Sequence, residues 1–501
     1  MESTAWVSEY SPLHYRAKDT SPDQTRSRRS LSRNPSSDIL FVDIDATPSC
    51  AKSGMFLEGL IYHELQPLET IDEAVGFATS HWTGQGSMLS CVFTLVASAM
   101  GAGCLSLPHM FSKTGIVCGL ALLACGALLA HVSLVILMSC ARYTQCRSFA
   151  ELVSLSEAEP SDGRSGRNPL VDTVIMFYGM AAVLIYMMLI GDFFADIAQS
   201  PLFGYADVPR QRLILASLIC VFPLSIPRNV TALRYISVLS TSVIVFLTVV
   251  VVAKMPSCAV TKPAAEASVW EENGPVRTIL QSFAMALFSF NAHTNAVPVA
   301  MALDQPRAAR IWQVSLLSVL IEFVIYSTIA TAGYLSFGRL TKQDFIRNYP
   351  PDDRWMLLVR CVYSVPVIFG VPINLSPAAA SIQALAGRIF SSKQQFRRQT
   401  SDPHPNSARS QCRRAGIVGA VLLCSALLAI CCDAFADVIG LFGACFGTAI
   451  CLMWPLRVYR HVMRDLHSNL LSTAVTIALT VASVLGVIAF LEQCLRVFHF
   501  S

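Results

Sequence analysis

The chain has 501 residues, of which 53% are hydrophobic and only 14% are charged, and its mean hydropathy is +0.52. A soluble protein of this length needs more charge on its surface, so the composition excludes a large soluble domain. The net charge of +4 is explained by basic loops beside apolar segments, and we expect no nucleic-acid partner. The composition therefore predicts an all-α integral membrane protein that lies in a lipid bilayer.

The first 85 residues differ from the rest of the chain. The stretch "SPDQTRSRRSLSRNPSSD" is rich in serine and arginine and too poor in apolar residues to form a core. No apolar stretch of the right length lies near Met1, so we do not expect a signal peptide. Residues 1–85 are predicted to be a disordered cytosolic tail.

Apolar segments that could cross a bilayer follow from residue 86 onward. A membrane-spanning helix needs about 20 mostly apolar residues. Eleven segments fit, over approximately 86–111, 116–140, 170–199, 211–227, 234–254, 276–301, 311–337, 355–386, 414–432, 435–456 and 469–493. Lysine and arginine are commoner in the loops that lie inside if the N-terminus is cytosolic. This bias predicts a cytosolic N-terminus and, with an odd number of spans, a C-terminus on the other side.

Two of these segments contain helix-breaking residues. Glycine weakens a helix interior and proline removes a backbone donor, so "SAMGAGCLSLPHMF" predicts an interruption in the first span. The sixth span contains "ALFSFNAHTNAVPVAM", where Asn291 precedes Pro298 by seven residues, as Gly101 precedes Pro108. Close helix packing through small residues is the alternative interpretation.

The two interruptions lie five spans apart. Residues 86–254 and 276–456 could therefore form two five-helix repeats of opposite orientation, with 469–493 as an additional helix. Paired interrupted helices at corresponding positions indicate a transporter binding site. Helix ends there offer amides to an anionic group and carbonyls to a cation, and a zwitterionic amino acid presents both charges.

At these residues the chain resembles the amino acid/auxin permease family, within the amino acid–polyamine–cation superfamily. "SAMGAGCLSLPHMFSKTGI" is similar to that family's first-span signature, "FSFNAHTNAVPV" to its sixth-span pattern, and "VRCVYSVPVIFGVPINLSPA" to its eighth-span pattern. The likeness covers approximately residues 85–495. It implies a five-plus-five inverted-repeat secondary transporter that carries amino acids.

The expected substrate site combines both interruptions. Gly101, Ala102 and Gly103 are expected to offer amides to the substrate carboxylate. The residues expected to line the amine and side-chain side are Phe290, Asn291, Ala292 and His293. Catalytic motifs are absent from the sequence, and Cys431-Cys432-Asp433 lacks metal-ligand spacing, so we expect no enzyme activity, cofactor or metal.

Four further residues are candidates for ion coupling or gating, because polar groups inside a membrane are costly and often functional. Glu322 is a sole carboxylate about halfway along its span, with a packing role as the alternative. Ser364 is the hydroxyl of the eighth-span pattern. Arg360 lies at the level of Asp192, and we expect these two to pair as a structural brace or an outer gate.

Two departures from the family pattern bear on coupling and gating. Sodium-coupled members tend to carry Asn where this chain has Ala97, so Ser364 alone offers an incomplete sodium cage. A proton needs only a carboxylate or imidazole such as Glu322 or His293. We therefore expect proton symport or facilitated transport rather than sodium coupling. Asn374 stands where the family has arginine, which could change gating.

Other functions remain open on the sequence. The same fold could carry another small organic ion, the chain could be a channel, or it could sense amino acids with only weak transport. We expect a multi-pass protein of the plasma membrane or of an acidic, vacuole- or lysosome-like compartment.

Overall fold

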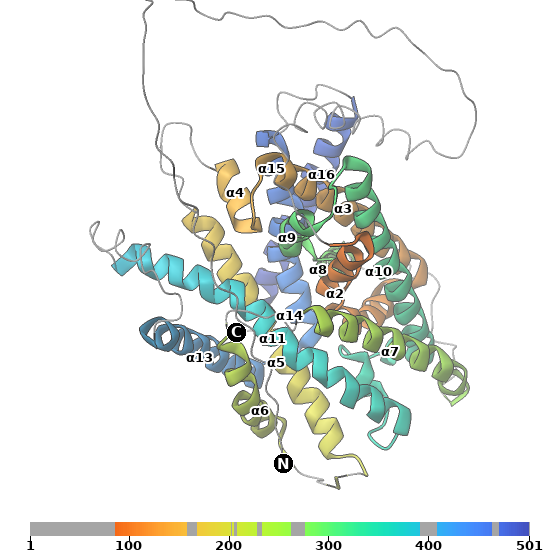
Figure 1. Cartoon of the computed structure of the whole chain (residues 1–501). Helices are drawn as coiled ribbons and strands as arrows, with labels where there is room; N and C mark the ends of the chain where they lie inside the picture. Colours follow the sequence, from red (N-terminus) through yellow and green to blue (C-terminus); the bar gives the residue numbers. More distant parts are fainter. Residues whose placement is uncertain are drawn as a thin grey trace, which may run out of the picture. The chain divides into compact units, whose positions relative to one another are not determined.

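The computed structural model describes residues 86–157, 168–201, 203–204, 208–227, 233–261, 276–390, 408–462 and 470–499. The predicted tail over 1–85 lies outside these ranges. The described residues form helices joined by turns, with one isolated bridge between Gly86 and Leu303 (Figure 1). The expectation of an all-helical chain is confirmed for this part of the sequence.

The first half of the chain contains an abrupt change of direction. Its elements are α2 (Met88–Ala99), the 3-10 helix η1 (Ala102–Ser106), α3 (Leu107–Thr144), α4 (Phe149–Glu157), α5 (Pro169–Ala198), α6 (Arg210–Ser225) and α7 (Leu233–Thr261). Within α3, Gly115 has a φ of 77°, which glycine adopts without strain. A Cβ added at Gly119 would lie 2.5 Å from the Phe111 ring. Residues eight apart in a straight helix are separated by about 12 Å, so the chain folds back at Gly115.

The second half begins with another interrupted helix. Its elements are α8 (Val276–Ser289), α9 (His293–Ala302), α10 (Ala308–Phe337), the 3-10 turns η3 (Gly338–Leu340) and η4 (Phe345–Asn348), α11 (Arg354–Phe390), α13 (Ala408–Cys431), α14 (Phe435–Phe442), the π-helical η5 (Gly443–Met453), α15 (Trp454–Val462) and α16 (Leu470–His499). α5 and α11 cross closely, since a Cβ added at Gly179 would lie 2.6 Å from the Ala378 side chain.

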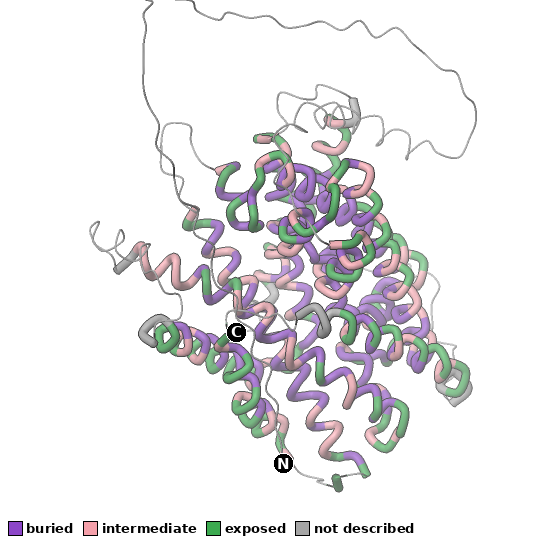
Figure 2. The backbone as a smooth tube through the Cα atoms, viewed as in Figure 1, coloured by how far each residue is buried: buried purple, intermediate pink, exposed green. Residues whose placement is uncertain are grey.

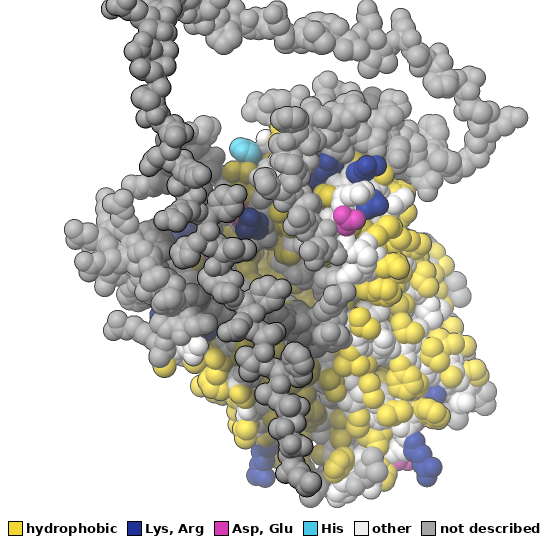
Figure 3. Space-filling model, viewed as in Figure 1, with side chains coloured by type: hydrophobic (Ala, Val, Ile, Leu, Met, Phe, Trp, Pro, Cys, Tyr) yellow, Lys and Arg dark blue, Asp and Glu magenta, His cyan; other side chains and the backbone are white. Residues whose placement is uncertain are grey.

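Eight helices among the described residues are long and apolar enough to cross a membrane. They lie within Ala102–Thr144, Pro169–Ala198, Val238–Ser257, Ala308–Leu340, Arg354–Arg388, Gln411–Cys431, Phe435–Val462 and Ser472–Leu495. The other three predicted spans are the one that begins with the short α2, the 16-residue α6, and the interrupted pair α8–α9. Figure 2 shows the buried residues concentrated inside the bundle, and Figure 3 shows hydrophobic side chains across the visible flank.

Contacts between helix termini define two ends of the bundle. At one end, which we call the Gly86 end, Gly86 pairs with Leu303, and Arg457 forms an ion pair with Glu157. At the other, which we call the Asp344 end, the loop between α10 and α11 meets the C-terminal part of α5 and the start of α6.

Candidate functional site

The first interruption lies between α2 and η1. The backbone leaves the helix at Met100, whose ψ is 92°, and Gly101 has φ −142° and ψ −140°. The Tyr363 hydroxyl of α11 donates a hydrogen bond to the Gly101 carbonyl oxygen at 3.1 Å. Because the first amides of a helix have no partner within that helix, Ala102 and Gly103 at the start of η1 have amides suited to an anionic group.

The glycines of this interruption also allow close packing. A Cβ added at Gly101 would lie 2.6 Å from the Tyr186 hydroxyl oxygen, and one added at Gly103 would lie 2.9 Å from Ser289 Oγ and 3.1 Å from Ser289 Cα. The two interpretations of the small residues are therefore compatible, because Gly101 lets the first interruption approach α5 and Gly103 lets it approach α8.

The second interruption separates α8 from α9. Phe290 and Asn291 continue the chain in tight turns, and α9 starts at His293. The Ser289 carbonyl oxygen accepts a hydrogen bond from the Tyr326 hydroxyl of α10 at 2.9 Å. The end of α8 is thus held by a side chain from a neighbouring helix, as the Gly101 carbonyl is held by Tyr363.

Both interruptions line one cavity of about 40 Å³. Its lining residues are all uncharged: Ser98, Ala99, Gly101, Ala102, Gly103, Tyr178, Ala182, Ile185, Tyr186, Phe288, Asn291 and Asn374. Asn291 is 5% exposed, and neither polar atom of its side chain has a hydrogen-bond partner among the described residues. An unpaired buried amide is costly, so Asn291 is available to bind a polar ligand.

The other three predicted residues of the sixth span have different neighbours and are not among the cavity lining. The Phe290 ring packs against the Tyr326 ring with centroids 5.2 Å apart, and Ala292 is fully buried. His293 Nε2 lies 2.6 Å from the Ser133 hydroxyl of α3. Within this span, Asn291 and Phe288 contribute to the cavity.

Glu322 lies between contacts that α10 makes with both interrupted helices. Ser318, one turn before it, contacts the Val92 carbonyl of α2 at 3.4 Å, and Tyr326, one turn after it, binds the Ser289 carbonyl of α8. Glu322 itself is 1% exposed, and neither carboxyl oxygen has a hydrogen-bond partner among the described residues. The hydrogen bond to a neighbouring helix that a packing role predicted is therefore not seen.

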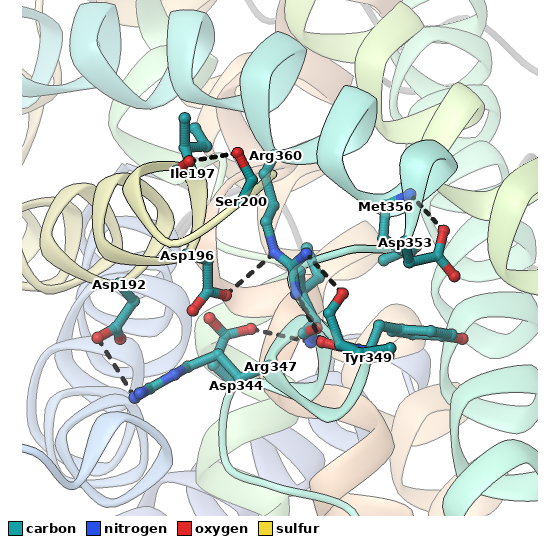
Figure 4. A network of polar contacts seen from close by, with 12 residues as sticks. Asp192, Asp196, Ile197, Ser200, Asp344, Arg347, Tyr349, Asp353, Met356 and Arg360 are labelled. Carbon is teal, nitrogen blue, oxygen red and sulfur yellow. Dashed lines mark hydrogen bonds and ion pairs between the residues drawn. The ribbon is translucent and has the colours of Figure 1, made fainter. Parts of the chain in front are cut away.

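The predicted ion pair between Arg360 and Asp192 is wrong. Arg360 Nε lies 3.0 Å from Asp196 Oδ2, one turn further along α5, while Asp192 binds Arg347 at 3.4 Å (Figure 4). Asp192 also binds Arg210 at 2.7 Å. The reason lies in the loop before α11, because the Arg360 guanidinium also donates to the carbonyl oxygens of the loop. These bonds go to Ile346 at 3.1 Å, Tyr349 at 2.8 Å and Pro350 at 3.4 Å.

Ser364 does not offer a free hydroxyl hydrogen to a ligand. Its Oγ donates a hydrogen bond to the Arg360 carbonyl oxygen in its own helix at 2.7 Å. The neighbouring Tyr363 makes the contact with the first interruption instead. Ala97, the position of the missing Asn, is half-buried in α2.

Sequence reasoning missed the tyrosines of the site. Tyr178, Tyr186 and Tyr363 lie in apolar helices, where a buried hydroxyl normally needs a hydrogen-bond partner. A tyrosine within such a helix was therefore the signal in the sequence that could have indicated them. Asn374 was noticed only as a departure from a pattern, yet it lines the cavity and its Nδ2 donates to the Gly370 carbonyl oxygen at 2.9 Å.

This geometry defines a class of protein, namely a helical membrane protein in which two interrupted helices share a small uncharged cavity. A model of the family described as "Transmembrane amino acid transporter protein" matches residues 84–495. The chain belongs to this family, which confirms the resemblance seen in the three motifs.

Relatives in other organisms carry related names. A Toxoplasma gondii protein described as a candidate amino acid transporter, AAT1, is 32% identical over 308 residues, which are 60% of this chain and 41% of that protein. Sodium-coupled neutral amino acid transporter 7 of Danio rerio is 27% identical over 305 residues, 58% of this chain and 63% of that protein. The chain thus spans less than two thirds of both. The Xenopus laevis transporter 7 is 27% identical over 384 residues, 74% of this chain and 79% of that protein.

A solved structure shares the fold. It is a nucleobase–cation-symport-1 family transporter in a closed conformation with bromovinylhydantoin bound, and it aligns with a TM-score of 0.55 and 15% identity. The alignment covers 82% of this chain and 92% of that one. At this level of identity, the likeness concerns the fold alone.

Proposed function

We propose that the chain is a secondary transporter that carries an amino acid across a membrane, and that the substrate binds in the cavity between the two interrupted helices. The observation that supports this most is the buried amide of Asn291 beside the first interruption, whose polar atoms have no hydrogen-bond partner among the described residues. The substrate carboxylate meets the amides of Ala102 and Gly103, and Asn291 binds a polar group of the same molecule. The names of the relatives favour an amino acid as the substrate.

We also propose that the chain crosses the membrane eleven times from a cytosolic N-terminus. In this arrangement 86–254 and 276–456 are inverted repeats and 469–493 is an additional helix. Two contacts support an odd number of crossings. Gly86 pairs with Leu303 at one end of the bundle, whereas Glu492 near the end of α16 pairs with Arg277 at the start of α8, on the side of the Asp344 end.

The proposal is tested by uptake of labelled amino acids into proteoliposomes that contain the purified protein. Asn291→Ala should raise KM about fivefold for the preferred substrate, because it removes a hydrogen bond worth about 1 kcal/mol. Asn295→Ala, which removes an amide one turn away and outside the cavity lining, is the matched control. No uptake of any member of the amino-acid panel would reject transport, and an unchanged KM in Asn291→Ala would reject the site.

We propose that the driving ion is a proton, or that transport is facilitative. Ala97 offers no side-chain oxygen to a sodium ion, whereas Glu322 is a buried carboxyl group with no hydrogen-bond partner among the described residues. Sodium coupling is the second candidate, and the names of the Danio rerio and Xenopus laevis relatives favour it.

A further inference from the structure

The loop between α10 and α11 is attached to several helices at the Asp344 end. The Thr341 carbonyl oxygen lies 2.8 Å from His109 Nδ1 of α3. Gln343 donates to Asp437 of α14 at 3.0 Å and accepts from the Ala436 backbone N–H at 2.9 Å. η4 contacts η1 of the first interrupted helix. In this bound position the loop lies against η1, which contains the cavity-lining residues Ala102 and Gly103.

Asp344 is buried at the centre of these contacts. It is 4% exposed, its Oδ1 accepts the Ile346 backbone N–H at 3.2 Å, and its Oδ2 has no hydrogen-bond partner among the described residues. Figure 4 shows its carboxyl group beside that of Asp196. A buried carboxylate facing another carboxylate favours the protonated form of one of them.

The surrounding cations are already engaged. Arg210 and Arg347 bind Asp192, and Arg360 binds Asp196. The charged and titratable groups on the elements around Asp344 are Asp192, Asp196, Arg210, Lys342, Arg347, Arg360, Cys104, His109 and Asp437. Burial, and then the charges of Asp192 and Asp196, raise the pKa of Asp344 to about 7, although Arg347 and the Ile346 N–H act in the opposite direction.

We propose that Asp344 is a proton-binding site that stabilises the bound position of this loop and thereby closes the cavity from the Asp344 end. The effect of loop closure on transport rests on the proposed function. The proton site and the position of the loop do not, since both can be studied without substrate. Acidification of the compartment that the Asp344 end faces, predicted to be the outside or the lumen, would then favour closure.

The direction of the pH effect follows from the two states of Asp344. When the loop leaves its bound position, the carboxyl group meets water and its pKa returns toward about 3.9. The bound loop therefore holds the proton more tightly. Its stabilisation by the proton is complete below about pH 4 and is lost as the pH rises through about 7. Between pH 5.5 and 7.5 the equilibrium between the bound and released positions of the loop should shift on the order of tenfold toward the released position.

Amide hydrogen exchange of the loop in the full-length protein in lipid nanodiscs tests this without any transport measurement. After correction for the intrinsic pH dependence of exchange, a peptide that contains residues 341–349 should exchange about tenfold faster at pH 7.5 than at pH 5.5. In Asp344→Asn, which keeps the acceptor for the Ile346 N–H, exchange should be equally slow at both values. Asp352→Asn removes an exposed carboxyl group from the same loop and should behave as wild type.

Two outcomes would overturn the proton site. The first is loop exchange in the wild-type protein that does not change with pH, a result that does not depend on how the variants fold. The second is a pH dependence that survives in Asp344→Asn and disappears in His109→Gln, which would assign the proton to the imidazole. Neither outcome bears on amino acid uptake, and a protein without uptake could still show the loop effect.

Discussion

Gly101 and Tyr186 approach closely at the first interruption, and this contact can be tested by compensation. A Cβ at Gly101 would meet the Tyr186 hydroxyl oxygen at 2.6 Å, whereas the next ring atom, Cζ, would be 3.6 Å away. Gly101→Ala should therefore lower the initial rate of uptake at least about tenfold, because a sub-ångström displacement at a binding site is costly. Adding Tyr186→Phe removes the obstructing oxygen and should restore most of that rate.

Uptake that stays equally low in the double variant would contradict the steric explanation. Gly103 is less suitable for this test, although the sequence pattern suggests it equally. A Cβ there would lie 3.1 Å from Ser289 Cα, so any side chain would displace backbone and disturb helix packing whether or not substrate binds nearby.

Arg360 joins three elements, namely α11, α5 and the loop before α11. Its guanidinium is fully buried and reaches Asp196 together with three loop carbonyls. A lysine has one ammonium group and cannot reproduce this planar set of donors. Arg360→Lys should therefore lower the thermal unfolding temperature by several degrees, for a loss of about 1–3 kcal/mol.

Thermal unfolding of the purified protein in detergent measures this loss without substrate. Arg354→Lys, at an exposed position one and a half turns earlier in α11, provides the matched control and should unfold as wild type does. Equal unfolding temperatures for both variants would show that the network in Figure 4 contributes little to stability.

The elements show what the sequence could predict. Helix positions and both interruptions follow from hydropathy, glycine and proline, because these depend on the local chain. Side-chain partners depend on how helices are rotated against one another. His293 lies at the predicted interruption but faces Ser133, and Arg360 has the predicted type of partner but on the next turn of α5. The two tyrosines that line the cavity, Tyr178 and Tyr186, come from α5, a continuous helix without an interruption signal.

For the whole molecule, the most informative measurement is one that identifies the coupling ion. If Ala97 and Glu322 determine the coupling ion as proposed, replacing external sodium by choline at fixed pH should leave uptake into proteoliposomes nearly unchanged. A large fall would contradict this and would support the sodium coupling that the relatives' names indicate.

In the sodium-independent case, Glu322→Gln separates the two remaining mechanisms. Glu322 lies buried between the contacts of α10 with α2 and α8, and its carboxyl group has no hydrogen-bond partner in the part of the chain that the structure describes. In a proton-coupled carrier, the amide cannot carry a proton, so accumulation driven by a pH gradient should be abolished while exchange of internal for external substrate persists. Unchanged accumulation would remove Glu322 from the coupling mechanism.

The bridge at Gly86 has a mechanical consequence. The Gly86 N–H donates to the Ala302 carbonyl oxygen at 2.8 Å, and the Gly86 carbonyl oxygen accepts from the Asp304 N–H at 3.0 Å. The entry to α2 is thereby bonded to the exit from α9, the two short rods on the same side of the interruptions. A force applied to the polypeptide just before residue 86 would therefore act on α2 and α9 together, through these two backbone hydrogen bonds.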